Sequence, residues 1–153
     1  MTTVSTDIAA PVERVWALVS DLTRMGEWSP ETQRVEWLDG ATEAAVGVRF
    51  KGHNQAGVRR WSTTGTITVA DPPSTLAWDV TSVGGLAVAQ WRYEIERITD
   101  TSCRVTESTT DRRGLLMKVL GNLATGVKDR GDHNAEGMRV TLERLKLAAE
   151  SPT

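Results

Sequence analysis

The sequence predicts an α+β domain in which a curved, seven-stranded antiparallel sheet wraps around a long C-terminal helix. Two short helices are expected between the first and second strands. Three patterns support this prediction: a helical repeat near the N-terminus, a long central stretch of period-two alternation, and a second helical repeat at the C-terminal end. A sheet with one apolar face needs a covering layer, and only the C-terminal segment is long enough to form it.

The N-terminal segment alternates and then becomes helical. A strand is expected at residues 2–9, where Val4 and Ile8 fall on the face opposite to their polar neighbours. Pro11 suits the first turn of a helix, because the N–H that it lacks would have no helical partner there. Apolar residues then recur at helical spacing, so two short helices are expected within residues 11–29, and Trp28-Ser29-Pro30 ends the second one.

Strands follow one another through residues 34–111. In the clearest of them, Trp61, Ile67 and Val69 share an apolar face opposite a row of polar residues. The same alternation turns a further set of residues inward: Trp78, Val80, Trp91, Tyr93, Ile95, Cys103, Val105, Glu107 and Thr109. Pairing the inward faces is expected to place Ile67 opposite Trp78, Trp78 opposite Tyr93, and Tyr93 opposite Glu107.

The C-terminal segment, residues 115–149, has a helical pattern. Its apolar stripe consists of Met138, Leu142, Leu145 and Ala149. Glycines interrupt the earlier part, and each costs about 1 kcal/mol inside a helix. A break is therefore expected between Leu120 and Gly131, with a regular helix from about Asp132. No linker or repeat divides the chain, so residues 1–153 are expected to form one domain.

Composition excludes several classes of protein. The chain has 153 residues, a net charge of −2 and 25% charged residues, which argues against a nucleic-acid-binding protein. Cys103 is the lone cysteine, so no internal disulfide is expected. No stretch approaches the ~20 apolar residues that span a bilayer, and the N-terminus lacks the pattern of a signal peptide. A cytoplasmic protein without integral membrane association is expected; the oligomeric state stays open.

Several segments resemble a known superfamily. They are Ile8 to Asp21, Trp28 to Pro30, Gly47 to Asn54 with Trp61, Trp91 to Tyr93, and Thr141 to Leu145. With the order of elements, they resemble the START-like, birch-pollen-allergen-like helix-grip superfamily (SRPBCC), and within it the polyketide cyclase/dehydrase branch. The resemblance covers essentially the whole chain. It implies a hydrophobic cavity between sheet and helix, and it does not imply an enzyme, because the superfamily contains carriers as well as cyclases.

Neither histidine predicts a metal site. Alternation puts His53 on the solvated face of its strand, and His133 lies in the helix far along the chain. A structural metal site takes four ligands at readable spacing, and the sequence has no such cluster. No phosphate-binding or dinucleotide-binding glycine motif is present either. No metal and no cofactor are therefore expected.

Glu107 and Tyr93 are the candidate catalytic residues. If they are neighbours on the inward face, an apolar environment disfavours the charged form of Glu107 and raises its pKa toward neutrality. Such a group could exchange a proton with a carbonyl ligand. The alternative is structural: Glu107 is held by Tyr93, an arginine or a backbone N–H, or lies at the rim in water.

The remaining candidates form the wall of the expected cavity. They are Asn54, Trp61, Ile67, Trp78, Val80, Trp91, Ile95, Thr109, Met138 and Leu142. Asn54 stabilises a turn or orients a ligand, and Arg112-Arg113 is solvated surface or a guard of the entrance; the sequence leaves both pairs of alternatives open. Few charges converge on this face, so the first hypothesis is a protein that binds or carries a small hydrophobic, lipid-like or polyketide-like molecule. The alternatives are a cofactor-free cyclase or dehydrase acting on a carbonyl substrate and a protein-interaction module without a ligand.

Overall fold

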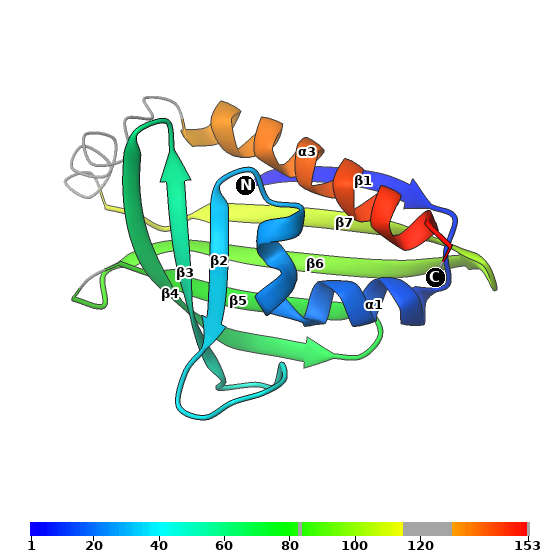
Figure 1. Ribbon diagram of the computed structural model, residues 1–153, viewed down its shortest axis with the longest axis horizontal. Helices are drawn as coiled ribbons and strands as arrows, with labels where there is room; N and C mark the ends of the chain where they lie inside the picture. The colour runs from blue at the N-terminus through cyan, green and yellow to red at the C-terminus, as the bar shows by residue number, and fades with distance from the viewer. Residues whose placement is uncertain (83, 115–129, 153) are drawn as a thin grey trace.

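In the computed structural model, which describes residues 1–82, 84–114 and 130–152, a curved sheet wraps around one long helix (Figure 1). The predicted α+β helix-grip architecture is confirmed. Its elements are β1 (Thr2–Ile8), α1 (Val12–Ser20), the 3-10 helix η1 (Leu22–Glu27), β2 (Thr32–Trp37), β3 (Arg49–Ala56), β4 (Arg59–Asp71), β5 (Thr75–Thr81), β6 (Ala87–Thr99), β7 (Ser102–Asp111) and α3 (Arg130–Glu150). The helical pattern expected over residues 115–129, with its break, lies outside the described residues.

The seven strands form one antiparallel sheet in the order β1-β7-β6-β5-β4-β3-β2. From β2 to β7 every strand pairs with its neighbour in sequence, as short turns between antiparallel strands favour. The first strand closes the other edge by pairing with β7. This arrangement leaves α1 and η1 to cross from one edge of the sheet to the other (Figure 1).

The strand register agrees with the sequence prediction in two pairs and differs in one. Ile67 lies opposite Trp78, and Tyr93 lies opposite Glu107, as expected. The predicted pairing of Trp78 with Tyr93 is wrong, because Trp78 pairs with Trp91. The error is a slip of two residues, which keeps every side chain on its predicted face and which alternation therefore cannot detect.

A bulge in β4 corrects one predicted face. Ile67 pairs with Trp78 but Val69 pairs with Ala77, so one extra residue lies between the two pairs on β4. The bulge turns Val69 away from the inner face on which alternation had placed it. Ala70 packs against the core in its place.

The long helix covers one side of the sheet rather than its centre. α3 packs mainly on β1 and also contacts β7 (Figure 1). Met138, Leu142 and Leu145 of its predicted stripe are fully buried. Because α3 lies toward the β1 edge, the inner face of β3, β4 and β5 is not filled by the helix.

An aromatic cluster shapes that open part of the sheet. Phe50 lies opposite Gly65, and a Cβ atom at Gly65 would come within 2.2 Å of Cζ of the Phe50 ring. Only glycine permits this close approach. The Phe50 ring meets Trp37 and Trp78 edge to face, with centroids 6.3 and 5.8 Å away. The ring is thereby held against the sheet, and space remains above it.

Candidate functional site

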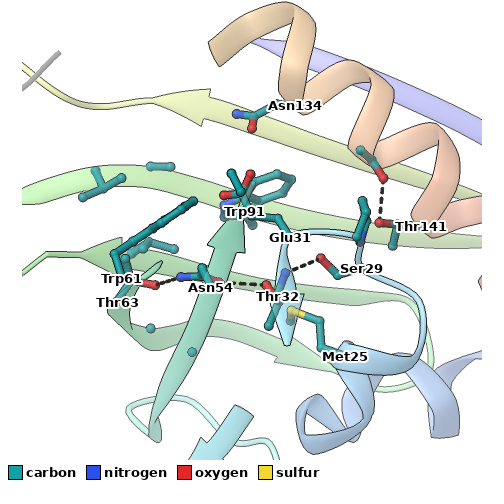
Figure 2. Close-up of a pocket in the computed structure, with 18 of the residues that line it drawn as sticks. Met25, Ser29, Glu31, Thr32, Asn54, Trp61, Thr63, Trp91, Asn134 and Thr141 are labelled. Atoms are coloured by element: carbon teal, nitrogen blue, oxygen red, sulfur yellow. Dashed lines mark hydrogen bonds between the residues drawn. The ribbon is translucent and has the colours of Figure 1, made fainter. Parts of the chain in front are cut away.

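A cavity of about 760 Å³ lies between the sheet and the N-terminal half of α3 (Figure 2). Its size falls within the ~300–1,000 Å³ typical of ligand pockets. The segment after η1 and strands β2 to β7 complete its walls. Its apolar lining includes Met25, Val35, Phe50, Trp61, Trp78, Val80, Val88, Trp91, Met138 and Val140. The site is therefore a mainly apolar cavity with several aromatic side chains in its wall, and the helix leaves it unfilled.

Six of the ten predicted wall residues border this cavity. They are Asn54, Trp61, Trp78, Val80, Trp91 and Met138. The other four, Ile67, Ile95, Thr109 and Leu142, are buried but do not line it. Alternation identifies the inner face of a sheet, whereas the position of the covering helices decides which part of that face borders a cavity.

Glu107 and Tyr93 lie opposite each other on β7 and β6, in the wall of the cavity. Their side chains are almost fully buried, with 4% and 5% of each residue exposed. Tyr93 lies directly opposite Glu107 on the neighbouring strand, with its hydroxyl close enough to the carboxyl to lower the pKa of Glu107. The Tyr93 ring stacks on Trp78 with centroids 5.9 Å apart. Within the described part of the chain, Oε2 of Glu107 has no hydrogen-bond partner. Oε2 could therefore form a hydrogen bond with a group outside the described residues, such as a ligand.

Burial changes the acid strength of both groups. Loss of water around Glu107 raises its pKa to about 8, although the hydrogen bond from Tyr93 acts in the opposite direction. Burial also raises the pKa of Tyr93 well above its ordinary value, and the nearby Glu107 adds to that rise. At neutral pH the pair is therefore mostly uncharged, with a carboxylic acid that can donate a proton or a hydrogen bond.

Asn54 joins three strands beside the cavity (Figure 2). Its Oδ1 accepts a hydrogen bond from the Thr32 hydroxyl at 3.0 Å, and its Nδ2 donates to the Thr63 hydroxyl at 3.2 Å. Both ends of the amide are engaged in binding β2 and β4 to β3. Asn54 was expected to stabilise a turn or to orient a ligand, and its hydrogen bonds instead join neighbouring strands, which is a structural role.

His133 has a partner that the sequence did not reveal. Its Nε2 lies 2.6 Å from Oε2 of Glu31, and both residues line the cavity. The contact ties α3 to the segment that precedes β2, two parts of the chain separated by 102 positions. No short-range pattern contains such a pair. His53, by contrast, lies where alternation predicts, on the outer face beside Glu36 at 2.9 Å.

Arg113 lines the cavity, and its side chain is only 9% exposed. Its Nε and Nη2 donate to the two carboxylate oxygens of Asp111 at 3.0 and 2.9 Å. The solvated-surface alternative is therefore wrong for this arginine. The sequence alone left the position of Arg113 open; the alternation of Cys103 and Glu107, continued past the end of β7, is the signal that could have placed it on the inner side.

The described residues also bear on metal binding and on membrane crossing. Within them, no group of three or more histidine, cysteine, aspartate and glutamate side chains is placed to hold a metal ion. None of the helices in these residues has the length and apolar character that a membrane crossing requires.

Comparisons with known proteins agree with this architecture. The family model described as polyketide cyclase / dehydrase and lipid transport matches residues 1–150. A sequence comparison with curated proteins finds no match.

Three solved structures illustrate the similarity. The di-domain ARO/CYC StfQ from the steffimycin biosynthetic pathway has a TM-score of 0.72 and 14% identity over 98% of this chain, which spans 45% of that protein. CV1439 from Chromobacterium violaceum has a TM-score of 0.68 and 14% identity, with 99% of both chains covered. The polyketide_cyc-like protein Cgl2372 from Corynebacterium glutamicum has a TM-score of 0.52 and 29% identity over 97% of this chain and 88% of its own.

Proposed function

The chain belongs to the polyketide cyclase / dehydrase and lipid transport family, and on this premise we propose that its cavity binds an uncharged hydrophobic small molecule of the polyketide or lipid type. The observation that carries the proposal is the unfilled chamber of about 760 Å³. Trp61, Trp78 and Trp91 line it, and aromatic walls of this kind provide large apolar contact areas for a ligand. A cavity with apolar walls is sufficient for a carrier, which binds its ligand without transforming it.

Filling the cavity from its wall tests the proposal. Gly52 is buried in the lining, and a Cβ atom there would meet only ordinary contacts, the nearest being Thr63 Oγ1 at 3.7 Å. We expect Gly52→Leu to weaken binding of a naphthalene-type fluorescent probe at least about tenfold, since its side chain occupies the ligand's space. Binding is measured by titration, with quenching of tryptophan emission as a second readout.

The matched control is Lys51→Leu, which adds the same side chain one residue away on the outer face of β3. It should leave probe binding unchanged. If no apolar probe binds the unmodified protein, and native mass spectrometry of the purified protein finds no retained small molecule, the carrier proposal fails. The interaction-module alternative then takes its place.

A second candidate function rests on one specific observation. Glu107 is a buried carboxylic acid with a pKa of about 8 that borders the cavity, and one of its oxygens is unpartnered among the described residues. A neutral acid in that position could protonate a carbonyl or a departing hydroxyl group, as a cyclase or dehydrase requires. Tyr93 would then hold the resulting carboxylate through its hydrogen bond. The similarity in fold to the di-domain ARO/CYC protein StfQ motivates the test.

Turnover separates an enzyme from a carrier. Glu107→Gln keeps the shape and a hydrogen-bond donor but removes the transferable proton. With a polyketone substrate, we expect an enzyme to lose at least about a hundredfold in rate while still binding the substrate, because general acid–base catalysis contributes about 10²–10⁴. Product formation is measured by chromatography. If the unmodified protein and Glu107→Gln form product at the same rate, Glu107 is not a catalytic residue.

A further inference from the structure

The inner wall of the cavity holds a polar atom without a protein partner. Glu107 is buried and borders the cavity, and its Oε2 makes no hydrogen bond to any described residue. Buried polar groups are nearly always hydrogen-bonded, and an unsatisfied one costs free energy. Val4 lies opposite on β1 and is apolar, and Tyr93 on β6 is the polar neighbour across the strand pair. The Thr109 hydroxyl, two residues further along the same face of β7, is also buried and also makes no hydrogen bond to a described residue. A ligand that reaches this wall of the cavity could satisfy Oε2.

We infer that the Glu107 carboxyl selects, among apolar molecules that fit the cavity, those that present a ketone-type oxygen to the wall formed by β6 and β7. The inference deepens the ligand-binding function proposed above and rests on it. Glu107 donates the hydrogen bond, the ketone oxygen accepts it, and the aromatic wall at Trp78 and Trp91 holds the rest of the ligand. No bond is broken, so the selection applies to a carrier and to an enzyme alike.

The protonation state of Glu107 decides the class of ligand. Burial keeps its pKa near 8, so at pH 6 the group is an acid that donates and has no charge with which to attract an amine. A carboxylate end of a ligand would have to give up its own hydration at this wall, which is costly. A ketone accepts one hydrogen bond and needs no counter-charge.

Other titratable groups border the cavity but are engaged elsewhere. On β7 and just after it, Asp111 and Arg113 pair with each other. From α3, His133 pairs with Glu31 of the segment before β2, while Glu136 pairs with Arg139. On the neighbouring strand β6, only the Tyr93 hydroxyl joins burial as a cause of the shifted pKa of Glu107. The pH dependence of ketone binding should therefore follow Glu107 itself.

A set of matched probes tests the inference. 2-Acetylnaphthalene and 2-isopropylnaphthalene have the same number of non-hydrogen atoms. The first carries a ketone oxygen where the second carries a methyl group. The measured quantity is the ratio of their dissociation constants for the unmodified protein. We expect this ratio to favour the ketone about three- to tenfold more at pH 6 than at pH 9.5, where the ionised carboxyl repels a carbonyl oxygen.

Two variants assign the effect to Glu107. Glu107→Gln keeps a donor that does not titrate, so its ketone preference should equal that of the unmodified protein at pH 6 and persist at pH 9.5. Glu107→Leu has no donor and should show the high-pH ratio at both pH values. Glu143→Gln, an exposed change on α3, should behave as the unmodified protein does.

The outcomes distinguish the inference from the function on which it rests. If both probes bind and their ratio is independent of pH, the ketone inference is overturned and the hydrophobic-ligand function stands. Tighter binding of 1-(2-naphthyl)ethylamine than of the ketone at pH 6 would likewise overturn it, in favour of an ionised Glu107 that binds a cation. If no probe binds at all, the proposed function fails and the inference fails with it.

Discussion

Replacing Leu145 by aspartate is expected to leave the protein unfolded at room temperature. Leu145 is completely buried, with 0% exposure, and belongs to the core beneath α3. Removing a buried leucine costs about 2–5 kcal/mol, and a buried charge without a partner adds several more. A domain of this size has about 5–15 kcal/mol of stability in total. Circular dichroism and a denaturant titration measure the loss.

Leu147 supplies the matched control. It lies two residues further along the same helix and is 63% exposed. Leu147→Asp has the same effect on helix propensity and net charge, so it should change the free energy of unfolding by less than about 1 kcal/mol. A cooperative, native-like melt of Leu145→Asp would contradict the arrangement in which α3 provides the core.

The order of the elements was predictable because it depends on local patterns. Alternation and helical spacing identify strands and helices by which side each residue faces, and the dry face of the sheet must be covered. The face on which each side chain lies was easier to predict than the pairing of residues between strands. A slip of one residue would bury a row of charges, whereas a slip of two, as in the pairing of Trp78 with Trp91, leaves every side chain on its face. The bulge before Val69 escaped prediction because nothing in the alternation marks an extra residue.

The candidate site was predictable only in part. Glu107 and Tyr93 were identified because each lies on an inward face whose neighbours are apolar. The Glu31–His133 contact was not, because it joins segments that meet only when α3 has docked on the sheet. The extent of the cavity also depends on where α3 packs on the sheet. Ile67 and Ile95 lie on the inner face but outside the cavity lining for this reason.

The stability of the protein should fall as the pH rises from about 5 to 9, and Glu107→Gln should abolish most of that fall. Burial raises the pKa of Glu107 from 4.5 to about 8 in the folded state. In the unfolded chain the side chain is hydrated and returns to its ordinary value. Between these two values the folded state binds more protons than the unfolded state, so the free energy of unfolding decreases with rising pH.

The expected size of this effect is large. One pKa unit corresponds to about 1.4 kcal/mol, so ionising Glu107 costs on the order of 3–5 kcal/mol once the pH exceeds about 8. The exposed carboxylates with lowered pKa values, such as Asp7 and Glu13, act in the opposite sense. Their stabilisation is lost only as the pH falls below about 4, so the two effects occupy separate pH ranges.

Urea titrations at pH 5, 7 and 9 measure the difference. Glu107→Gln should match the unmodified protein at pH 5, because both then carry a neutral side chain, and should exceed its free energy of unfolding by several kcal/mol at pH 9. Tyr93→Phe should move the fall to higher pH, because the hydrogen bond from Tyr93 lowers the pKa of Glu107. Glu143→Gln, exposed on α3, should reproduce the unmodified curve. If the stabilities of the unmodified protein and Glu107→Gln stay parallel from pH 5 to 9, Glu107 is ionised throughout, and the neutral donor on which the ketone inference depends does not exist.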